Sequence, residues 1–156
     1  MEPSRFDEVA FFAAVDESGA RALLIGRRAL VLLGLPVLTA DYDFWLSIDD
    51  IARFNAVGKQ FDLQPSRSPD EARRHGRYVL ENDEHIDVLV ARAMPTVAGV
   101  TIEFDALWTR RQTVRLDHTN VAIPSIDDLI LTKQVAARPK DLEDIALLRI
   151  LKDTRP

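Results

Sequence analysis

Residues 41–46, DYDFWL, constrain the fold more than any other segment, because they place two acidic side chains inside an apolar run. Side chains alternate across a β-strand with a period of two. As a strand, this segment carries Asp41 and Asp43 on one face. Tyr42 and Phe44 lie on the other face, where they can anchor the strand in a core. Charged groups are costly to remove from water unless they are paired or bind a metal, so the acidic face needs a separate explanation.

The rest of the chain alternates between helical and extended patterns. Helices are expected at residues 6–18, 27–34, 51–61, 68–76, 128–137 and 138–153. The expected caps at helix starts are Ser4 with Asp7, Asp49, Ser68 with Glu71, and Ser125 with Asp128, and Gly19 is expected to end the first helix. Strands are expected at residues 22–26 and 41–46, and in two hairpins at 77–82 with 85–91 and 112–117 with 121–125. This order predicts an α/β or α+β fold, in which helices flank a mixed β-sheet and further helices end the chain. Without a repeat or linker, residues 1–156 are expected to form a single domain.

Composition favours an ordinary globular protein. Hydrophobic residues make up 47% and charged residues 29% of the 156 residues, and the net charge is −5. Cysteine is absent, which excludes disulfides and thiolate metal sites. No segment has the pattern of a signal peptide or of a membrane span, so we expect a cytoplasmic protein that does not contact a membrane. The acidic balance argues against unspecific coating by nucleic acid. Two arginine clusters are either solvated surface or patches that face a polyanion: Arg73, Arg74 and Arg77, and Arg110, Arg111 and Arg115.

A third acid stands in a comparable position. Asp87 lies in the expected strand HIDVLVA, between Ile86 and Val88. If that strand lies beside residues 41–46, three carboxylates can converge at one edge of the sheet. Carboxylate oxygens without histidine or cysteine ligands suit Mg²⁺, which binds one or two carboxylates together with substrate phosphates. The alternative is structural: a turn cap and two surface acids.

Residues 22–29, ALLIGRRA, place a glycine between an apolar strand and a helix. Free backbone N–H groups at such a junction favour phosphate, and Gly26 lets a phosphate approach the backbone closely. In the sequence, a turn that can bind phosphate is therefore followed by an acidic strand that can hold a metal ion.

Together these residues resemble the nucleotidyltransferase superfamily, the polymerase-β-like fold. The signature is an apolar residue followed by Gly and a small residue, a gap, and then Asp–x–Asp between apolar residues. Here it reads Ile25, Gly26 and Arg27, then a gap of 13 residues before Asp41 and Asp43. Residues 131–148, LTKQVAARPKDLEDIALL, are similar to the C-terminal motif of bacterial AbiEii-like toxin nucleotidyltransferases. That motif pairs a helix lysine with Arg–x–x–Asp–x–x–Asp, and its positions are filled by Lys133, Arg138, Asp141 and Asp144.

The resemblance implies roles for individual residues. Asp41, Asp43 and Asp87 are the implied catalytic and metal-binding residues, with Asp87 as third ligand or as base. The implied nucleotide-binding residues are Gly26, Arg27, Thr39, Lys133 and Asp141. Lys133 either reaches the phosphates or extends along the surface to solvent. Asp144 is expected to be structural, while Asp141 either holds a neighbouring cation or favours the helix start.

Arg27 departs from the superfamily pattern, which has glycine or serine at this position. Its guanidinium either donates a bidentate pair of hydrogen bonds to phosphate, or fills the site and pairs with Asp41 or Asp43. The resemblance therefore implies two functions. One is an Mg²⁺-dependent nucleotidyltransferase that moves an NMP from an NTP to an RNA or protein acceptor, in a toxin–antitoxin-type system. The other is a catalytically degenerate protein that acts as a binding or regulatory partner. The oligomeric state stays open.

Overall fold

The computed structural model describes residues 6–155. The helices are α1 (Glu8–Ser18), α2 (Gly26–Leu32), α3 (Ile51–Gln60), α4 (Pro69–His75), α5 (Phe104–Thr109), α6 (Ile126–Lys133) and α7 (Pro139–Thr154), with a 3₁₀ turn η1 (Ile48–Asp50) before α3. The strands are β1 (Ala22–Ile25), β2 (Tyr42–Leu46), β3 (Gln64–Pro65), β4 (Arg77–Glu81), β5 (His85–Leu89), β6 (Ala93–Pro95), β7 (Thr101–Glu103), β8 (Gln112–Leu116) and β9 (Thr119–Ile123).

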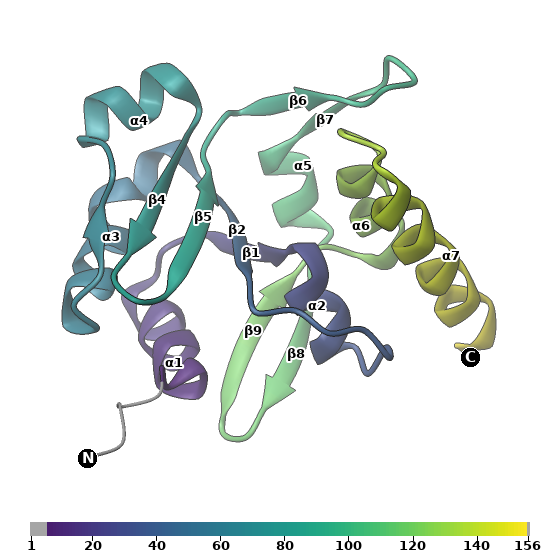
Figure 1. Cartoon of the computed structure of the whole chain (residues 1–156), viewed down its shortest axis with the longest axis horizontal. Helices are drawn as coiled ribbons and strands as arrows, with labels where there is room; N and C mark the ends of the chain where they lie inside the picture. The colour runs from purple at the N-terminus through teal and green to yellow at the C-terminus, as the bar shows by residue number, and fades with distance from the viewer. Residues whose placement is uncertain (1–5, 156) are drawn as a thin grey trace.

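The main sheet has five strands in the order β1-β2-β5-β4-β3 (Figure 1). β2 and β5 are parallel neighbours, and the other pairs are antiparallel. β6–β7 and β8–β9 form two separate hairpins. The predicted fold class, a mixed sheet flanked by helices, is therefore confirmed.

One face of the sheet is covered by α1 and α3. Phe44 of β2 contacts Phe11 of α1 and Phe54 of α3 edge-on, with ring centroids 6.0 and 5.2 Å apart. Tyr42, Phe44 and Leu46 are all buried, so the predicted apolar face of β2 is confirmed. This aromatic cluster removes a large apolar area from water and holds the centre of the sheet in place.

The other face is covered over only part of its width. Leu23 of β1 and Trp45 of β2 pack against Phe104 and Leu107 of α5, and the side of α6 joins this second cluster. On the same face, β4 and β5 present side chains that stay half-buried or exposed, such as Val79 and Asp87. The sheet therefore has one fully packed face and one face that is open beside its centre.

Several expected elements are confirmed with their capping residues. Gly19 ends α1 in a left-handed conformation, and Ser68 and Glu71 form the capping box that starts α4. Ser125 caps α6 by accepting a hydrogen bond from the N–H of Asp128. At α1 the cap is Asp7, and the expected contribution of Ser4 lies outside the described residues.

Other expectations were wrong in detail. Asp49 does not cap α3, because the chain turns through η1 first and the carboxylate of Asp50 accepts from the N–H of Arg21. β2 begins at Tyr42, so Asp41 lies in the preceding loop rather than on the strand. α6 ends at Lys133, four residues before the expected end, and Ala137 adopts a left-handed conformation beyond it. The hairpin β6–β7 and α5 were not expected at all.

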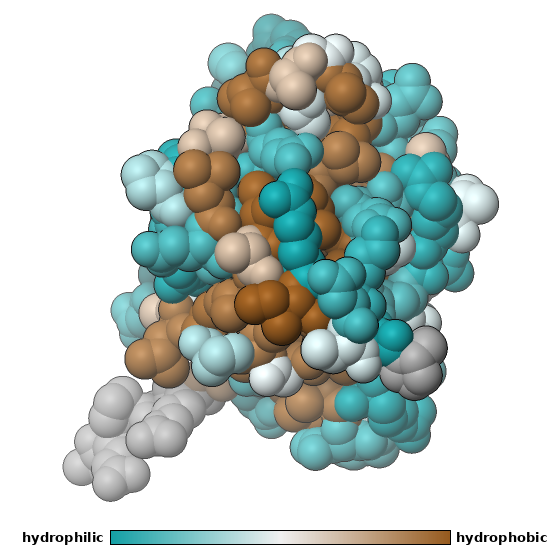
Figure 2. Space-filling model, turned by 90° about the vertical axis from the view of Figure 1, so that its right-hand side faces the viewer, coloured by the Kyte–Doolittle hydropathy of each residue, from teal (hydrophilic) through white to brown (hydrophobic). Residues whose placement is uncertain are grey.

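α6 and α7 lie together at one side of the molecule (Figure 1). On that side, hydrophobic and hydrophilic residues are interspersed (Figure 2). α7 leaves Leu142 and Ile150 exposed. Within residues 6–155, no helix combines the length and apolar character that crossing a membrane requires.

Candidate active site

Two of the predicted acids are direct neighbours across the parallel pair β2–β5. Asp43 and Asp87 are partners in the strand register, and both point to the open face of the sheet. Asp41 sits just before β2 in a turn where its N–H donates to Oγ1 of Thr39 at 3.0 Å. The parallel register therefore brings Asp43 and Asp87 together, and the turn holds Asp41 near the start of β2.

The environment of Asp43 disfavours its charged form. Burial is the largest cause, and the neighbouring carboxylates of Asp87 and Asp41 add to it; together they raise the pKa of Asp43 to about 6. Lys133 and Lys140 partly offset this effect. A divalent cation would relieve the same repulsion, so the donor set fits Mg²⁺. Within the described residues, however, no group of three or more acidic or histidine side chains is close enough to hold a metal ion as it stands.

Gly26 starts α2 directly behind Asp43. Its φ of +69° lies in the left-handed region, and a Cβ there would come within 2.5 Å of Oδ2 of Asp43. Position 26 therefore requires glycine for two reasons: the left-handed backbone turn and the lack of space for a Cβ beside Asp43.

Opposite the acids lies a group of cations next to or within α7, called the cationic wall below. Its members are Arg27, Lys133, Arg138 and Lys140. Lys133 is only 7% exposed, and its Nζ lies 2.8 Å from Oδ2 of Asp144. The same oxygen accepts from Nε of Arg27 at 3.2 Å. Asp144 is completely buried, and its other oxygen has no hydrogen-bond partner within residues 6–155. The prediction that Asp144 is structural fits this geometry, and the alternative in which Lys133 extends to solvent is wrong.

The alternative in which Arg27 fills the site by pairing with Asp41 or Asp43 is wrong. Arg27 forms no ion pair with Asp41 or Asp43 in the described part of the chain. Its guanidinium lies between Asp144, the exposed Glu143 and the carbonyl of Leu38. The side chain therefore lines the site from the side without closing it.

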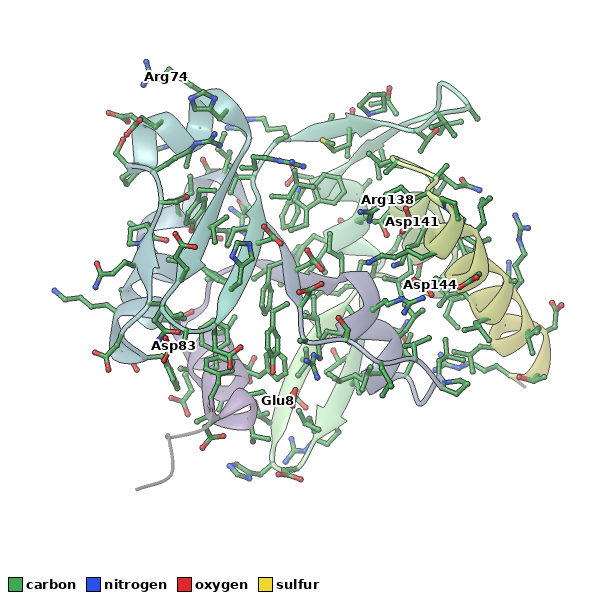
Figure 3. All side chains as sticks on the ribbon, in the orientation of Figure 1. Glu8, Arg74, Asp83, Arg138, Asp141 and Asp144 are labelled. Atoms are coloured by element: carbon green, nitrogen blue, oxygen red, sulfur yellow. The ribbon has the colours of Figure 1, made fainter. Side chains whose placement is uncertain are left out.

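Asp141 holds a third cation of the wall, Arg138. Its Oδ2 accepts from Nε and from the backbone N–H of Arg138, while Oδ1 lies 3.7 Å from Nζ of Lys133. Burial alone would raise the pKa of Asp141, but the hydrogen bonds from Arg138 outweigh burial and keep that pKa below its ordinary value. Figure 3 shows Arg138, Asp141 and Asp144 along the side of α7 that faces the rest of the molecule.

Acids and cations together line a pocket of about 170 Å³. Of the predicted site residues, this pocket contains all but Asp87; its charged and polar lining is Gly26, Arg27, Thr39, Asp41, Asp43, Thr132, Lys133, Arg138, Lys140 and Asp141. Asp87 lines an adjoining groove that shares Asp43 and Arg138 with the pocket. Residues from four separate segments therefore meet at the pocket and the adjoining groove.

Sequence reasoning missed Lys140 as a site residue. It lies in the first turn of α7, two residues after Arg138, and lines the pocket opposite Asp43. In the sequence it is one of 20 basic residues. Only its place beside the Arg–x–x–Asp motif could have pointed to it.

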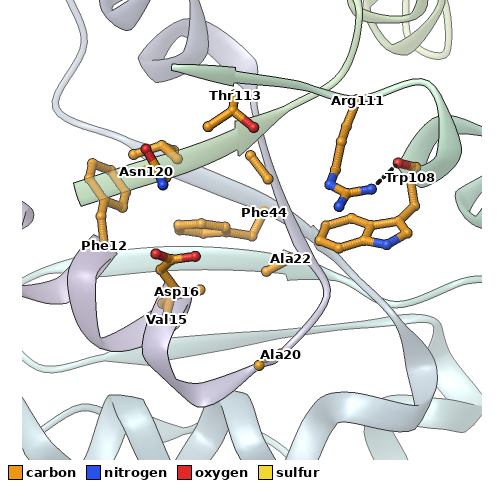
Figure 4. Close-up of a pocket in the computed structure, with 13 residues that line it drawn as sticks. Phe12, Val15, Asp16, Ala20, Ala22, Phe44, Trp108, Arg111, Thr113 and Asn120 are labelled. Atoms are coloured by element: carbon orange, nitrogen blue, oxygen red, sulfur yellow. Dashed lines mark hydrogen bonds between the residues drawn. The ribbon is translucent and has the colours of Figure 1, made fainter. Parts of the chain in front are cut away.

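Arg110 and Arg111 of the second arginine cluster make structural contacts. Arg110 donates two hydrogen bonds of 2.9 Å to the buried carboxylate of Asp128. Arg111 stacks on the ring of Trp108 at 4.0 Å. Both Arg111 and Trp108 border a separate pocket of about 240 Å³ between α1 and the β8–β9 hairpin (Figure 4). Phe44 forms its floor, so it lies on the opposite face of β2 from the acids.

Comparison with known proteins gives a clear result for the fold. No family model and no curated protein matches the sequence. Among solved structures, the antibiotic-resistance factor ANT(2'')-Ia superposes with a TM-score of 0.65 at 15% identity, covering 90% of this chain and 80% of that one. The lincosamide antibiotic adenylyltransferase LnuA, with lincomycin bound, has a TM-score of 0.63 at 12% identity over 94% and 98% of the two chains. A protein from Thermotoga maritima, described as a candidate nucleotidyltransferase, has a TM-score of 0.60 at 13% identity over 95% and 91%.

The chain therefore has the nucleotidyltransferase fold. At these identities the likeness concerns the fold alone. What the site does must be argued from its residues.

Proposed function

We propose that this protein is a nucleotidyltransferase that transfers an NMP from an NTP to a hydroxyl acceptor. One observation carries the proposal: Asp43, the register partner of Asp87, faces a cationic wall across one pocket. The resemblance of the fold to adenylyltransferases such as LnuA supports it.

The cations and the acids of the site have different roles in this proposal. Arg27, Lys133, Arg138 and Lys140 would bind the phosphates of the NTP as fixed positive charges, and Gly26 lets the chain pass close to them. Asp41 and Asp43, with Asp87 beside them, would hold Mg²⁺, which supplies charge neutralisation at the transferring phosphate. Catalysis then rests mainly on positioning and on charge stabilisation.

The reaction forms one bond and breaks one. The acceptor oxygen attacks the α-phosphorus, the bond from that phosphorus to the bridging oxygen of the β-phosphate breaks, and pyrophosphate leaves. The hydroxyl proton would pass to Asp87, an exposed acid that lines the open groove. Asp43 would position the metal ion, and Asp144 holds the side chains of Arg27 and Lys133 in place.

Isotope placement tests the transfer. The protein is incubated with Mg²⁺, RNA or protein mixtures, and each NTP labelled at either the α- or the γ-phosphate. Nucleotidyl transfer moves the α-label and never the γ-label to the acceptor. The double variant Asp43→Asn with Asp87→Asn should lose the transfer by about 10³-fold or more, while the exposed turn variant Asp83→Asn keeps it. Transfer of the γ-label, or full transfer by the double variant, would contradict the proposal.

Binding gives an independent test. An NTP with Mg²⁺ should raise the melting temperature of the protein through mass action. If no nucleotide raises it, the alternative of a degenerate binding partner replaces the enzyme.

The finer role follows from the similarity to AbiEii-like toxins. We propose that the acceptor is a cellular RNA or protein and that a partner protein controls the activity. Expression of the wild-type chain in bacterial cells should then slow growth, whereas Asp43→Asn should not. Equal growth of both strains would remove the toxin role and leave the chemistry untouched.

A further inference from the structure

Beside the acids, the open face of the sheet forms a groove of about 790 Å³. Its floor is made by β4 and β5, whose residues Val79, Val88 and Leu89 line it. Three arginines border it, namely Arg67, Arg77 and Arg138. Apart from Asp43 and Asp87, no acidic residue lines this groove in residues 6–155.

Arg67 and Arg77 are held together at the far end of the groove. One Nη of Arg67 donates to the backbone carbonyl of Arg77 at 2.7 Å. That contact uses one of five donors and leaves the others for a ligand. Neither arginine forms an ion pair with a carboxylate in the described part of the chain. Their charges are therefore not neutralised by the protein.

Arg138 stands between the nucleotide pocket and the groove. It lines both, and Asp141 takes its Nε but leaves its terminal nitrogens. Once Asp43 and Asp87 are neutralised by a bound cation, the uncompensated charge of the groove is that of Arg67 and Arg77, because Arg138 is paired with Asp141. Such a surface attracts anions and repels cations.

The spacing along the sheet is short. Val79 is the register partner of Asp87, and Arg77 lies two residues before it on the same face of β4. Strand geometry then separates the Cα atoms of Arg77 and Asp87 by about 8 Å, from about 7 Å along the strand and about 4.8 Å across it. A hydroxyl at the acids and an anion at Arg77 can therefore belong to one small molecule.

We propose that the groove binds a phosphate group of the acceptor, with Arg67 and Arg77 as its anion subsite. This inference rests on the proposed nucleotidyl transfer but not on the proposed toxin role with its RNA or protein acceptor, and it names the chemical class of the acceptor. The acceptor is a phosphorylated sugar hydroxyl, and the phosphate at Arg67 and Arg77 places that hydroxyl at Asp43 and Asp87. The source of the phosphate is either a small sugar phosphate or the end of an RNA strand.

The phosphates of the NTP do not account for this end of the groove. They already have Arg27, Lys133 and Lys140 in the other pocket, and none of these three lines the groove. An uncharged or cationic acceptor would leave Arg67 and Arg77 without a binding role.

Titrations followed by ¹H–¹⁵N NMR test the subsite without any need for catalysis. The probes are ribose 5-phosphate, a short 5′-phosphorylated RNA, and ribose as the neutral control. We expect ribose 5-phosphate to shift the signals of Ser66, Arg77 and Val79. The double variant Arg67→Ala with Arg77→Ala should weaken this binding by about tenfold or more. The matched double variant Arg73→Ala with Arg74→Ala removes the same charge from α4, where Figure 3 shows Arg74 at the outer end, and should change it less than about twofold.

The two phosphate sources separate in the same experiment. Tighter binding of the RNA, with a steep dependence on salt, identifies a strand end; equal binding identifies a small sugar phosphate. Two results would overturn the inference: ribose binds as tightly as ribose 5-phosphate, or the shifts are confined to Gly26, Arg27 and Lys133. A failure of nucleotidyl transfer itself would appear separately, as the absence of α-label transfer to any acceptor.

Discussion

The two faces of β2 differ in environment, because one is packed with apolar side chains and the other carries acids. Phe44 is buried among aromatic rings, with Phe12 and Phe54 within 6.2 and 5.2 Å of its ring centroid. Asp43, one residue earlier, faces two other carboxylates and has a raised pKa. One face of this five-residue strand therefore stabilises the fold, while the other holds a carboxylate whose charged form is disfavoured by burial and by like charges.

This difference shows how a small protein can hold like charges together. Burial of Phe44 and its neighbours fixes β2, and the fixed strand then presents Asp43 whether or not its charge is favourable. We expect mutations on the two faces to change stability in opposite directions, which can be measured.

The largest effect is expected at Phe44→Ala. Removal of a fully buried aromatic ring leaves a cavity, and should lower the free energy of unfolding by about 3–5 kcal/mol. Denaturant titration monitored by circular dichroism measures it. Leu142→Ala, at an exposed position on α7, is the control and should change stability by less than about 0.5 kcal/mol. A loss below about 1 kcal/mol at Phe44 would show that this face is not the main source of stability.

The next effect tests the cationic wall. Asp144→Asn removes the charge that neutralises the buried Lys133, and should cost about 3 kcal/mol of stability. It should also reduce the thermal shift caused by Mg²⁺ and NTP, because Arg27 and Lys133 lose their common anchor. Glu143→Gln is the matched control, since Glu143 meets the same Arg27 at 3.9 Å on the surface. If both variants behave alike, Asp144 is not an anchor.

A smaller effect is expected at the glycine behind Asp43. Gly26→Ala forces a Cβ against that carboxylate in a left-handed backbone, and should cost about 1–3 kcal/mol together with most of the nucleotide binding. Gly34→Ala separates the two causes, because Gly34 has a similar φ of +87° but nothing within 4 Å of the added Cβ. Equal losses in nucleotide binding would mean that the space beside Asp43 has no role.

The smallest effect has the opposite sign. The folded pKa of Asp43 is about 6, above the unfolded value of about 3.9. The folded state therefore holds the proton more tightly, and stability falls as the pH rises from about 4 to 6. Asp43→Asn removes this penalty and should stabilise the metal-free protein at pH 7 by about 1 kcal/mol, a value reduced by solvent screening. Melting curves between pH 4 and 7 measure this change, with Asp83→Asn as control. If Asp43→Asn is less stable than the wild type at pH 7, the charge of Asp43 does not destabilise the fold.

Much of the fold could be predicted from local patterns. The period-two alternation of residues 41–46 gave the buried face of β2, and the capping residues Ser68 and Ser125 marked two helix starts. The hairpin β6–β7 and α5 were missed because residues 93–109 have no regular alternation, and their structure depends on packing against Trp45.

The site was predicted in its parts but not in its arrangement. The acids and the glycine turn followed from spacing, since alternation and register are local rules. The direction of Arg27 could not follow, because its partner Asp144 lies 117 residues further along the chain. The groove arginines were hidden for the same reason: Arg67 and Arg77 become neighbours only through the pairing of the segment after β3 with β4.

That long-range partner has a consequence for biosynthesis. Ribosomes make the chain from its amino end, so Gly26, Arg27 and the acidic strand emerge well before Asp144 does. Until the last helix has been translated, nothing neutralises Lys133 or holds Arg27 aside. A nascent chain that already has its sheet therefore lacks the assembled pocket, and Arg27 and Lys133 reach their observed positions only after α7 has been made.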